Sequence, residues 1–445
     1  MKMSKKFHLI SLGCTKNLVD SEVMLGCLSA YENTQDVSEA DVVIVNTCGF
    51  IEAAKQESIQ TLLNALEAKK DEAILVASGC LSERYAKELK QEIPEIDIIT
   101  GVGDYDKIDV MIQKRKKGEE ICQSQNGVFL ANETTKRVIS GSKIHAYIKL
   151  SEGCNQKCSF CAIPSFKGKL HSRTLESTLK EVQALVKQGF RDFSFISQDS
   201  SSYMRDLGVK DGLVALIKGI DKLVENGLDL RSARILYLYP STTSKELIQA
   251  ICDSKVFVNY FDMPLQHASP SVLKTMGRSH HFKDLLKEMR KTPNSFVRTS
   301  FIIGHPGESE SDFEELCAFI EEFPFDRMNL FAFSKEEGTK SAEMEQIPQK
   351  TINARLKAIN AIFTKQYQAD LKALKDEEIV VIIEGKSEES EYFYSARDVR
   401  FAPSIDGEIL INDSLLEGEL EAGYYKVKIT EVVGENVLGR VIARA

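Results

Sequence analysis

The chain has 445 residues, of which 43% are hydrophobic and 28% charged, and these ordinary values exclude a disordered or a fibrous protein. At roughly 150 residues per domain, this length predicts about three domains. The net charge of −9 lies entirely in residues 376–445, which hold 16 acidic and 7 basic residues, so the rest of the chain is neutral. Because an acidic surface repels phosphates, this segment is expected to attract basic partners.

The N-terminus has a basic start followed by a short apolar stretch at residues 7–12. This stretch is shorter than the roughly 7 to 15 apolar residues of a secretion signal, and no apolar run reaches the roughly 18 residues of a membrane span. We therefore expect a cytoplasmic protein. In such a protein, the ten cysteines favour metal binding or catalysis over disulfides.

The first third of the chain alternates strand and helix patterns, which predicts an α/β domain with a parallel, doubly wound sheet at residues 1–135. A polar, turn-rich stretch at residues 123–142 is typical of a linker. The strand patterns lie at residues 7–14, 41–50 and 73–80, and the helix patterns at residues 17–31, 51–70 and 81–92.

The middle of the chain, residues 140–372, repeats this alternation about six times. Six βα units predict an open, partial TIM-like barrel, whose chemistry would lie at the carboxyl ends of its strands. A long helix at residues 351–374 leads out of this domain. The strand patterns lie at residues 145–150, 192–197, 233–239, 260–265, 296–303 and 327–333.

The last segment, residues 375–445, changes character because it shows five short strand patterns and no good helix. Turn signals separate the strands. This pattern predicts a small β-barrel of the OB type.

Three cysteines with CxxxCxxC spacing, Cys154, Cys158 and Cys161, follow the first strand of the predicted barrel. Thiolates are the usual ligands of iron-sulfur clusters, and three of them leave one iron of a cubane open to a substrate. The alternatives are a zinc site completed by a distant ligand such as His171, or simple burial of the cysteines. The spacing favours an iron-sulfur cluster.

A second set of cysteines stands at the carboxyl ends of the first three strand patterns, at Cys14, Cys48 and Cys80. In a parallel sheet these ends share one edge, where ligands bind. The three cysteines could therefore hold a second cluster, although cysteine is also common as a small buried side chain. The other four cysteines show no such placement and are expected to be structural: Cys27, Cys122, Cys252 and Cys317.

Other candidates for cofactor binding are polar or glycine residues at strand ends, where side chains of such a barrel contact ligands more often than they pack in the core. The glycines of GHPGE allow close backbone approach, although such a loop is more often a plain turn. The aromatic residues Tyr237, Tyr239 and Phe261 are expected in the core. The full set of candidates is Phe160, Gln198, Asp199, Gln266, Arg298, Gly304, Gly307 and Glu308, with His267 beside them.

Six motifs in order, SLGCTKNLVDSE, NTCGFI, GCL, GCNQKCSFCAIPSFKG, PLQHASPSVLKTMGR and FIIGHPGE, resemble the radical S-adenosylmethionine (SAM) methylthiotransferases over nearly the whole chain. The resemblance implies two 4Fe-4S clusters, an auxiliary one on Cys14, Cys48 and Cys80 and a radical-forming one on Cys154, Cys158 and Cys161. It also implies SAM as radical source and methyl donor, and a C-terminal TRAM domain that grips the substrate.

Two branches of this family compete. One, MiaB-like, modifies a tRNA adenosine, and the other, RimO, methylthiolates the β-carbon of an aspartate in the twelfth protein of the small ribosomal subunit. The forms CTKN, IPSFKG and LQHAS resemble RimO, and an acidic third domain suits a basic ribosomal protein better than RNA. A non-catalytic iron-sulfur or zinc sensor, or a ribosome-binding protein, is the remaining alternative.

The resemblance also implies further partners: an electron donor such as flavodoxin or ferredoxin and a sulfur donor, with no membrane and no direct tRNA binding. Two positions depart from the family pattern. His305 stands where relatives usually have phenylalanine, and its role is open. Lys167 fills a position that is often arginine, so it keeps a charge but loses the bidentate geometry.

Overall fold

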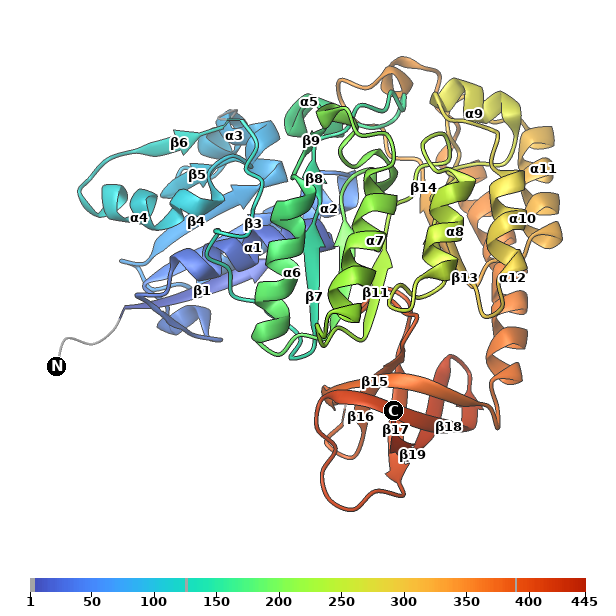
Figure 1. The fold of residues 1–445 in the computed structure, drawn as a ribbon. Coiled ribbons are helices and arrows are strands. Elements are labelled where there is room, and N and C mark those ends of the chain that lie inside the picture. The colour runs from blue at the N-terminus through green and yellow to red at the C-terminus, as the bar shows by residue number, and fades with distance from the viewer. Residues whose placement is uncertain (1–4, 125–126, 389) are drawn as a thin grey trace.

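The computed structural model describes residues 5–124, 127–388 and 390–445, which form three units in chain order (Figure 1). Residues 1–4 of the expected first domain, residues 125–126 of the expected linker and residue 389 of the expected third domain lie outside the described residues. Across the part of the chain that the structure describes, no helix is long and apolar enough to cross a membrane.

The first unit is a six-stranded sheet in which every neighbouring pair of strands is parallel, in the order β2-β1-β3-β4-β5-β6. The expected strands correspond to β1, β3 and β4. The other three span three residues or fewer, which is too short for a periodic pattern. The strands are β1 (Lys6–Ser11), β2 (Glu32–Asn33), β3 (Val42–Thr47), β4 (Ile74–Gly79), β5 (Ile98–Thr100) and β6 (Ile121–Gln123).

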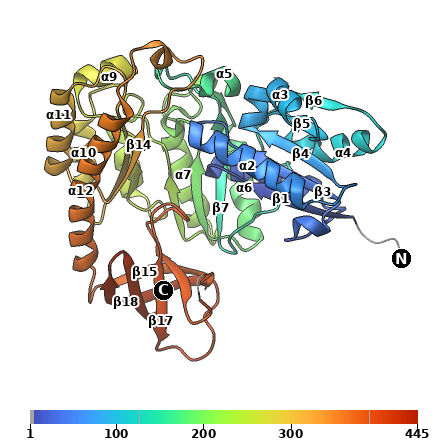
Figure 2. The same ribbon diagram turned by 180° about the vertical axis from the view of Figure 1, so that it is seen from behind.

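Helices cover both faces of this sheet, so the expected doubly wound fold is confirmed. Along β3, Val42 and Ile44 join one hydrophobic cluster and Val43 and Val45 join another, because successive side chains point to opposite faces. Figure 2 shows α2 across the face that is turned away in Figure 1. One face carries α1 (Thr15–Cys27) and α4 (Ile108–Lys116), and the other α2 (Glu52–Ala68) and α3 (Cys80–Glu92).

The second unit contains the six expected strands in chain order, as two parallel three-stranded sheets joined by a bridge between Ala233 and Phe257. Among the described residues no ladder joins the last strand to the first, so the barrel is open, as expected. The strands are β7 (His145–Lys149), β10 (Asp192–Ile196), β11 (Ser232–Ile235), β12 (Tyr260–Asp262), β13 (Phe296–Ile303) and β14 (Arg327–Ala332).

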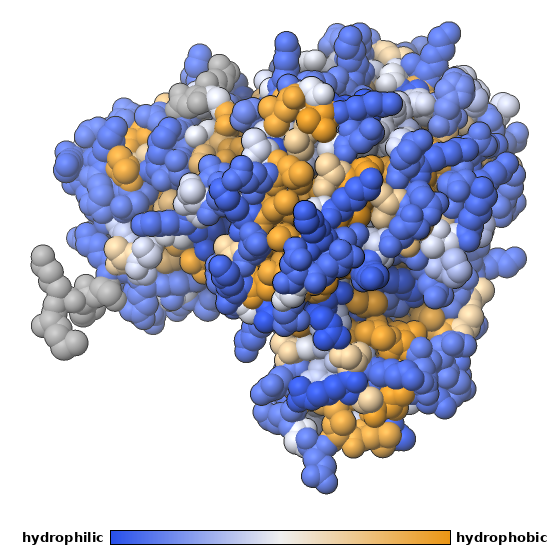
Figure 3. Space-filling view, in the orientation of Figure 1, coloured by the Kyte–Doolittle hydropathy of each residue, from blue (hydrophilic) through white to orange (hydrophobic). Residues whose placement is uncertain are grey.

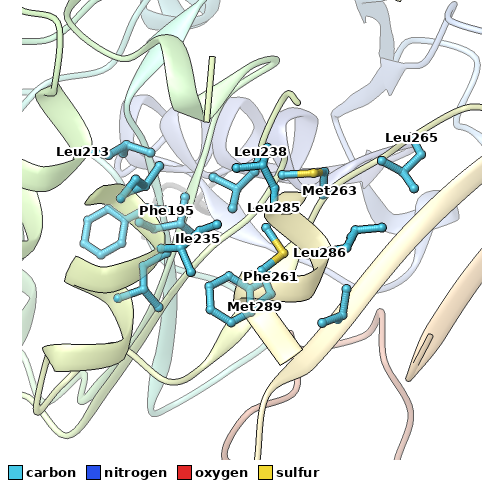
Figure 4. Packing of buried hydrophobic residues seen from close by; sticks show 14 of the residues in the cluster. Phe195, Leu213, Ile235, Leu238, Phe261, Met263, Leu265, Leu285, Leu286 and Met289 are labelled. Carbon is cyan, nitrogen blue, oxygen red and sulfur yellow. The ribbon is translucent and has the colours of Figure 1, made fainter. Parts of the chain in front are cut away.

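The outer helices of this barrel pack against its strands through one large apolar cluster. In Figure 4, Phe195, Ile235 and Phe261 from the strands face Leu286 and Met289 from a helix. Burying such side chains stabilises each by about 1.5–3 kcal/mol. The helices are α6 (Leu175–Lys187), α7 (Gly212–Glu225), α8 (Lys245–Asp253), α9 (Pro270–Met276), α10 (Lys283–Lys291) and α11 (Glu310–Glu322).

Strand β11 ends at Ile235, four residues before the end of its sequence pattern at residues 233–239. The reason is local, because Tyr237 adopts a left-handed backbone conformation with φ of 64° that no strand can contain. Small elements cover the carboxyl end of the barrel: β8 (Ser151–Glu152), α5 (Ile163–Lys167) and β9 (His171–Ser172). Within the described ranges, five short 3₁₀ helices complete the helical segments: η1 (Val37–Glu39), η2 (Tyr105–Lys107), η3 (Ser200–Ser202), η4 (Arg205–Leu207) and η5 (Lys340–Glu343).

The third unit is a closed five-stranded barrel, as expected, with the order β15-β16-β17-β19-β18. The long helix α12 (Gln349–Ala373) leads into it. The surface is mainly hydrophilic, with apolar patches over the second and third units (Figure 3). The strands are β15 (Glu378–Lys386), β16 (Tyr394–Asp398), β17 (Ile409–Ser414), β18 (Gly423–Val433) and β19 (Asn436–Arg444).

The third unit docks on the amino-terminal end of the central barrel. Asp192, at the start of β10, accepts hydrogen bonds from Arg234 and from Arg397 of β16, each at 2.7 Å. The segment at residues 399–408 enters the barrel, where Asp406 lies 3.3 Å from Nε of Arg298. The carboxyl ends of the central strands therefore lie at the other end of the unit, away from the acidic barrel (Figure 1).

The segment between the first two units is fixed to both of them. Its Arg137 pairs with Glu22 of α1 at 2.5 Å and with Glu181 of α6 at 3.0 Å. The same guanidinium donates to the backbone oxygen of Tyr147 in β7 at 2.7 Å. These buried contacts hold the first unit against the barrel and so fix the space between them.

Candidate functional site

A cavity of about 430 Å³ lies between the first and second units, at the carboxyl ends of their strands. All six cysteines singled out from the sequence line it, although residues 14 and 161 are far apart in the chain. The other four cysteines do not. The cysteines of the cavity are Cys14, Cys48, Cys80, Cys154, Cys158 and Cys161.

The first three cysteines stand on neighbouring loops at one sheet edge. Cys14 is the N-cap residue of α1, Cys48 directly follows β3, and Cys80 is the first residue of α3. These loops pack so closely that a Cβ at Gly13 would lie 2.8 Å from the Cys48 sulfur, and a Cβ at Gly49 would lie 3.0 Å from the Cys80 carbonyl carbon. Glycine at these two positions therefore lets the three cysteine-bearing segments pack side by side.

The second three cysteines lie on the loop that follows β8, and backbone hydrogen bonds fix its course. The N–H of Cys154 donates to the oxygen of Gly168 at 3.1 Å, and that of Cys161 donates to the oxygen of Cys158 at 3.2 Å. Gly277, with φ of 67°, lets the end of α9 approach, since a Cβ there would lie 2.7 Å from the Lys157 oxygen. The loop is thus held before any ligand binds.

Burial sets the charge state of these thiols. It raises the pKa of Cys80 to about 12, that of Cys154 to about 11 and that of Cys161 to about 12. The positive charges of Lys167 near Cys80 and of Arg278 near the other two oppose this effect. Such thiols keep their protons until a metal takes the place of the proton.

The residues that line the cavity fit iron-sulfur clusters in their chemistry. They include two groups of three cysteine thiols, and thiolates are the usual ligands of such clusters. Within the described residues, no three side chains of His, Cys, Asp or Glu converge as they would around a single metal ion. His171, the candidate for completing a zinc site, is exposed on β9 and does not line the cavity.

Four of the expected cofactor-contacting residues line the cavity: Phe160, Gln198, Gln266 and Arg298. The amide of Gln198 donates to Glu152 at 2.6 Å, while its buried Oε1 has no hydrogen-bond partner among the described residues. Gln266 adopts a left-handed conformation with φ of 74°, and its backbone bonds to Ser300 and Ile302 of β13. Both side chains are therefore held with polar groups near the cavity.

The other four, Asp199, Gly304, Gly307 and Glu308, do not line the cavity. Asp199 caps η3 and accepts from Gln156 at 2.7 Å. Glu308 pairs with Arg355 at 2.7 Å and accepts from the backbone N–H of Gly304 at the same distance. These contacts give them supporting positions behind the cavity wall, so their contact with a cofactor stays a prediction.

His305 and His267 belong to the same supporting layer. His305 is buried, its Nε2 lies 2.8 Å from the Ser341 hydroxyl, and its ring packs edge-on against Phe160. Burial lowers the pKa of His305 to about 4, so the ring is neutral at ordinary pH. His267 lies 3.6 Å from Glu308. His305 thus fills the position by packing behind the cavity-lining Phe160.

Two tyrosines expected in the core also line the cavity, and of these Tyr239 is buried as expected while Tyr237 is only partly buried. The hydroxyl of Tyr239 lies 3.7 Å from the Cys158 sulfur, and its ring carries Arg278 at 3.9 Å from the centroid. Tyr237 lies on the same segment, while Phe261 is fully buried as expected. Sequence reasoning missed Arg278 as well, although the position of both tyrosines just beyond a strand end was a usable signal.

A buried group of four charges joins the first two units beside the cavity. Lys149 lies 2.5 Å from Asp20 of α1 and 2.6 Å from Glu152, and Lys167 lies 3.4 Å from Glu152. Although burial opposes the charge of Glu152, the two lysines hold its pKa down at about 2. Lys167 therefore acts by charge, in line with the single-point geometry expected of lysine.

The remaining cysteines show one difference from expectation. Cys27, Cys252 and Cys317 are partly buried within helices, but Cys122 is exposed on the edge strand β6. Burial in the core thus does not explain Cys122.

Three family models match the chain: the uncharacterized protein family UPF0004 at residues 6–101, the radical SAM superfamily at residues 148–320 and the TRAM domain at residues 377–442. Among solved structures, the radical SAM methyltransferase TsrM from Kitasatospora setae matches with a TM-score of 0.53, covering 74% of this chain and 72% of that one. At 14% identity this likeness shows the fold alone.

Curated relatives match over the full length. A protein of Wolinella succinogenes is 62% identical over 99% of both chains, and one of Helicobacter pylori is 57% identical over 100% of this chain and 99% of its own. One of Aliarcobacter butzleri is 56% identical over 99% of this chain and 98% of its own. All three are named ribosomal protein uS12 methylthiotransferase RimO, and the matched family models imply iron-sulfur clusters and SAM. The chain therefore belongs to the RimO family of radical SAM methylthiotransferases.

Proposed function

We propose that this enzyme methylthiolates the β-carbon of an aspartate in ribosomal protein uS12, with SAM as both radical source and methyl donor. The observation that carries the proposal is the single cavity that receives all six cysteines from two units. The reaction needs two activities in one place, because a carbon radical must form and then meet sulfur. The names of the full-length relatives support the choice of substrate.

In this proposal Cys154, Cys158 and Cys161 ligate a 4Fe-4S cluster that binds SAM, and Cys14, Cys48 and Cys80 ligate an auxiliary 4Fe-4S cluster. When bound, the first supplies the electron that releases a radical from SAM, and the second supplies sulfur. The residues themselves hold, orient and enclose the reactants.

The charges of the cavity fit SAM as the ligand at Cys154, Cys158 and Cys161. Arg278 lies 3.7 Å from the Cys158 sulfur and has no carboxylate partner among the described residues, so it can receive the carboxylate of SAM. The free Oε1 of Gln198 can accept from a ligand N–H or O–H. Phe160, Gln266 and Arg298 complete the proposed contacts from the cavity wall.

An apolar wall gives the cavity a second property, because it limits the contact of the reactants with water, although Phe50 and Phe331 of this wall are exposed. Dry surroundings protect a carbon radical from side reactions and strengthen the charged contacts nearby. The aromatic and aliphatic residues of this wall are Phe50, Ile51, Phe160, Ile163, Phe166, Phe331 and Phe333.

We propose domain limits of 1–135, 140–372 and 375–445, with the third domain as the substrate grip. Its acidic surface suits a basic ribosomal protein. Since this barrel docks at the end of the central unit opposite the cysteines, a substrate that contacts both must extend along the central unit. A flavodoxin or ferredoxin as electron donor and a separate sulfur donor complete the proposed partners.

The substrate proposal predicts that the reconstituted enzyme modifies uS12 and leaves tRNA unchanged. With ribosomes or free uS12, SAM and a reductant under anaerobic conditions, mass spectrometry is expected to show one methylthio group in place of one hydrogen on one aspartate. The matched control is uS12 with that aspartate changed to asparagine, which is expected to stay unmodified. Methylthiolated tRNA bases with unmodified uS12 would contradict the proposal.

If the acidic third domain binds uS12, reversing the charge of its surface should weaken that binding. Glu417, Glu419 and Glu421 are exposed between β17 and β18, and their replacement by lysine is expected to raise the Kd for uS12 up to about tenfold at low salt. The effect should shrink as salt screens the charges.

The matched control for this prediction carries the same change of charge on the first unit. Glu67, Glu72 and Glu95 are exposed near the edge of the first sheet opposite the cysteines, and their replacement by lysine is expected to leave the Kd unchanged. Equal Kd values for both triple variants, measured by titration, would remove the role of the acidic barrel.

A further inference from the structure

The cations that line the cavity differ in whether their charge is balanced. Lys167 pairs with Glu152 at 3.4 Å, and Arg298 pairs with Asp262 at 2.9 Å. Arg278 lies against the Cys158 sulfur, at the radical-forming cysteine set. Lys16 lines the cavity too, and among the described residues no carboxylate lies within ion-pair distance of its ammonium.

Lys16 stands beside the auxiliary cysteine set. It lies two residues after Cys14, in the first turn of α1. Its ammonium is 3.6 Å from the centroid of the Tyr237 ring, across the boundary between the first two units. A ring face attracts a cation but leaves it charged, so the ammonium keeps its capacity to bind an anion.

The ring that holds Lys16 is itself fixed by a strained backbone. Tyr237 has φ of 64°, a conformation that is strained in a residue other than glycine and that clusters at functional sites. Its N–H donates to Asp262 at 3.0 Å, and its carbonyl oxygen accepts from the N–H of Ser200 at 3.0 Å. These two bonds fix the backbone of Tyr237 at the cavity wall. The ring of Tyr237, which contacts the Lys16 ammonium, is therefore held there as well.

We infer that Lys16 is the carboxylate-binding residue for the substrate, and that it receives the side chain of the aspartate that is modified. This inference rests on the proposed function. The carboxylate and the reacting β-carbon of an aspartate are adjacent, so a cation beside Cys14 places that carbon near the sulfur-bearing end of the cavity. The inference makes Lys16 a specificity-determining residue, because asparagine or a neutral base offers no charge to balance it.

A carboxylate in this cavity can come from two sources, the substrate side chain or the methionine part of SAM. The position of the two unbalanced cations assigns them differently, since Arg278 adjoins Cys158 and Lys16 adjoins Cys14. The test must therefore separate binding of uS12 from binding and cleavage of SAM.

The experiment is a double-mutant cycle with the cluster-loaded enzyme. Lys16→Met is measured against uS12 and against uS12 with the target aspartate changed to asparagine. We expect Lys16→Met to raise the Kd for native uS12 at least about tenfold, as removal of one partner of a buried charge pair does, and to change the Kd for the asparagine form little. Lys16→Arg, which keeps the charge, is expected to restore part of the affinity.

Two controls keep the outcome specific to the substrate. Lys87→Met, at an exposed position on α3, is expected to match the wild type in all measurements. Iron content, SAM affinity and SAM cleavage without uS12 are expected to be unchanged in Lys16→Met. Equal losses for both uS12 forms, or a loss of SAM binding or cleavage, would overturn the inference. A wild-type enzyme that neither binds nor modifies uS12 would instead contradict the proposed function.

Discussion

Replacing Cys14, Cys48 and Cys80 together with alanine is expected to abolish methylthio transfer while reductive cleavage of SAM continues. The reason is the division of the cavity into two cysteine sets on different units, of which the change removes only one. After anaerobic reconstitution, iron per chain should fall from about eight atoms to about four, because one cubane is lost. Chromatography of 5′-deoxyadenosine and mass spectrometry of uS12 measure the two activities separately.

Two further variants test the same prediction, one without the other cysteine set and one without two cysteines outside the cavity. Alanine at Cys154, Cys158 and Cys161 is expected to abolish both SAM cleavage and methylthio transfer. Alanine at Cys27 and Cys122, which do not line the cavity, is expected to leave iron content and both activities unchanged. A wild-type protein with only about four irons, or with bound zinc and no iron, would contradict the assignment of two clusters.

Replacing Asp192 with alanine is expected to lower the free energy of unfolding by about 3–5 kcal/mol. The change leaves two buried guanidiniums, those of Arg234 and Arg397, without their shared carboxylate. Because Arg397 belongs to the third unit, the docking of the acidic barrel should weaken at the same time. Urea denaturation followed by circular dichroism measures the first effect, and limited proteolysis near residues 374–377 measures the second.

An exposed ion pair provides the control for Asp192. Asp229 pairs with Arg191 at 2.6 Å but is largely exposed, so its replacement by alanine is expected to cost less than about 1 kcal/mol. If the two alanine variants unfolded at the same urea concentration, the buried pair would not hold the units together.

The same carboxylate predicts how this part of the stability depends on pH. Although burial opposes its charge, Arg234 and Arg397 hold the pKa of Asp192 well below its usual range. The stabilisation is therefore fully present above the carboxyl pKa of the unfolded chain, about 3.9, and is lost as the pH falls through the lower pKa of the folded state. The difference in stability between wild type and Asp192→Ala should accordingly shrink in acid.

Much of the architecture could be predicted from local patterns. Period-two and period-3.6 patterns are set by neighbouring residues, so the six strands of the central barrel were found at nearly their observed positions, and five strands were expected in the C-terminal barrel. Strands of two or three residues, such as β2 and β5, carry no such period. The strand at residues 233–239 was placed too long because its pattern does not show the left-handed turn at Tyr237.

The candidate site could likewise be predicted only in part. Cys14, Cys48 and Cys80 were placed together because carboxyl ends of parallel strands share an edge, which is a rule of topology that sequence order reveals. Asp199 and Glu308 follow strands too, yet they lie behind the cavity wall. A position after a strand shows at which end of the sheet a side chain lies. It does not show whether the side chain points into the cavity, because that direction depends on the residues packed around it.

By itself, the sequence determined the three units, the two cysteine sets and the acidity of the last segment, since each depends on residue type and short-range spacing. Only the tertiary structure decided that both cysteine sets open onto one cavity and that the acidic barrel docks at the far end. It also decided that Lys167 pairs with Glu152, while among the described residues no carboxylate lies within ion-pair distance of Lys16. Charge balance depends on contacts between segments distant in the chain, and these arise only when the units pack.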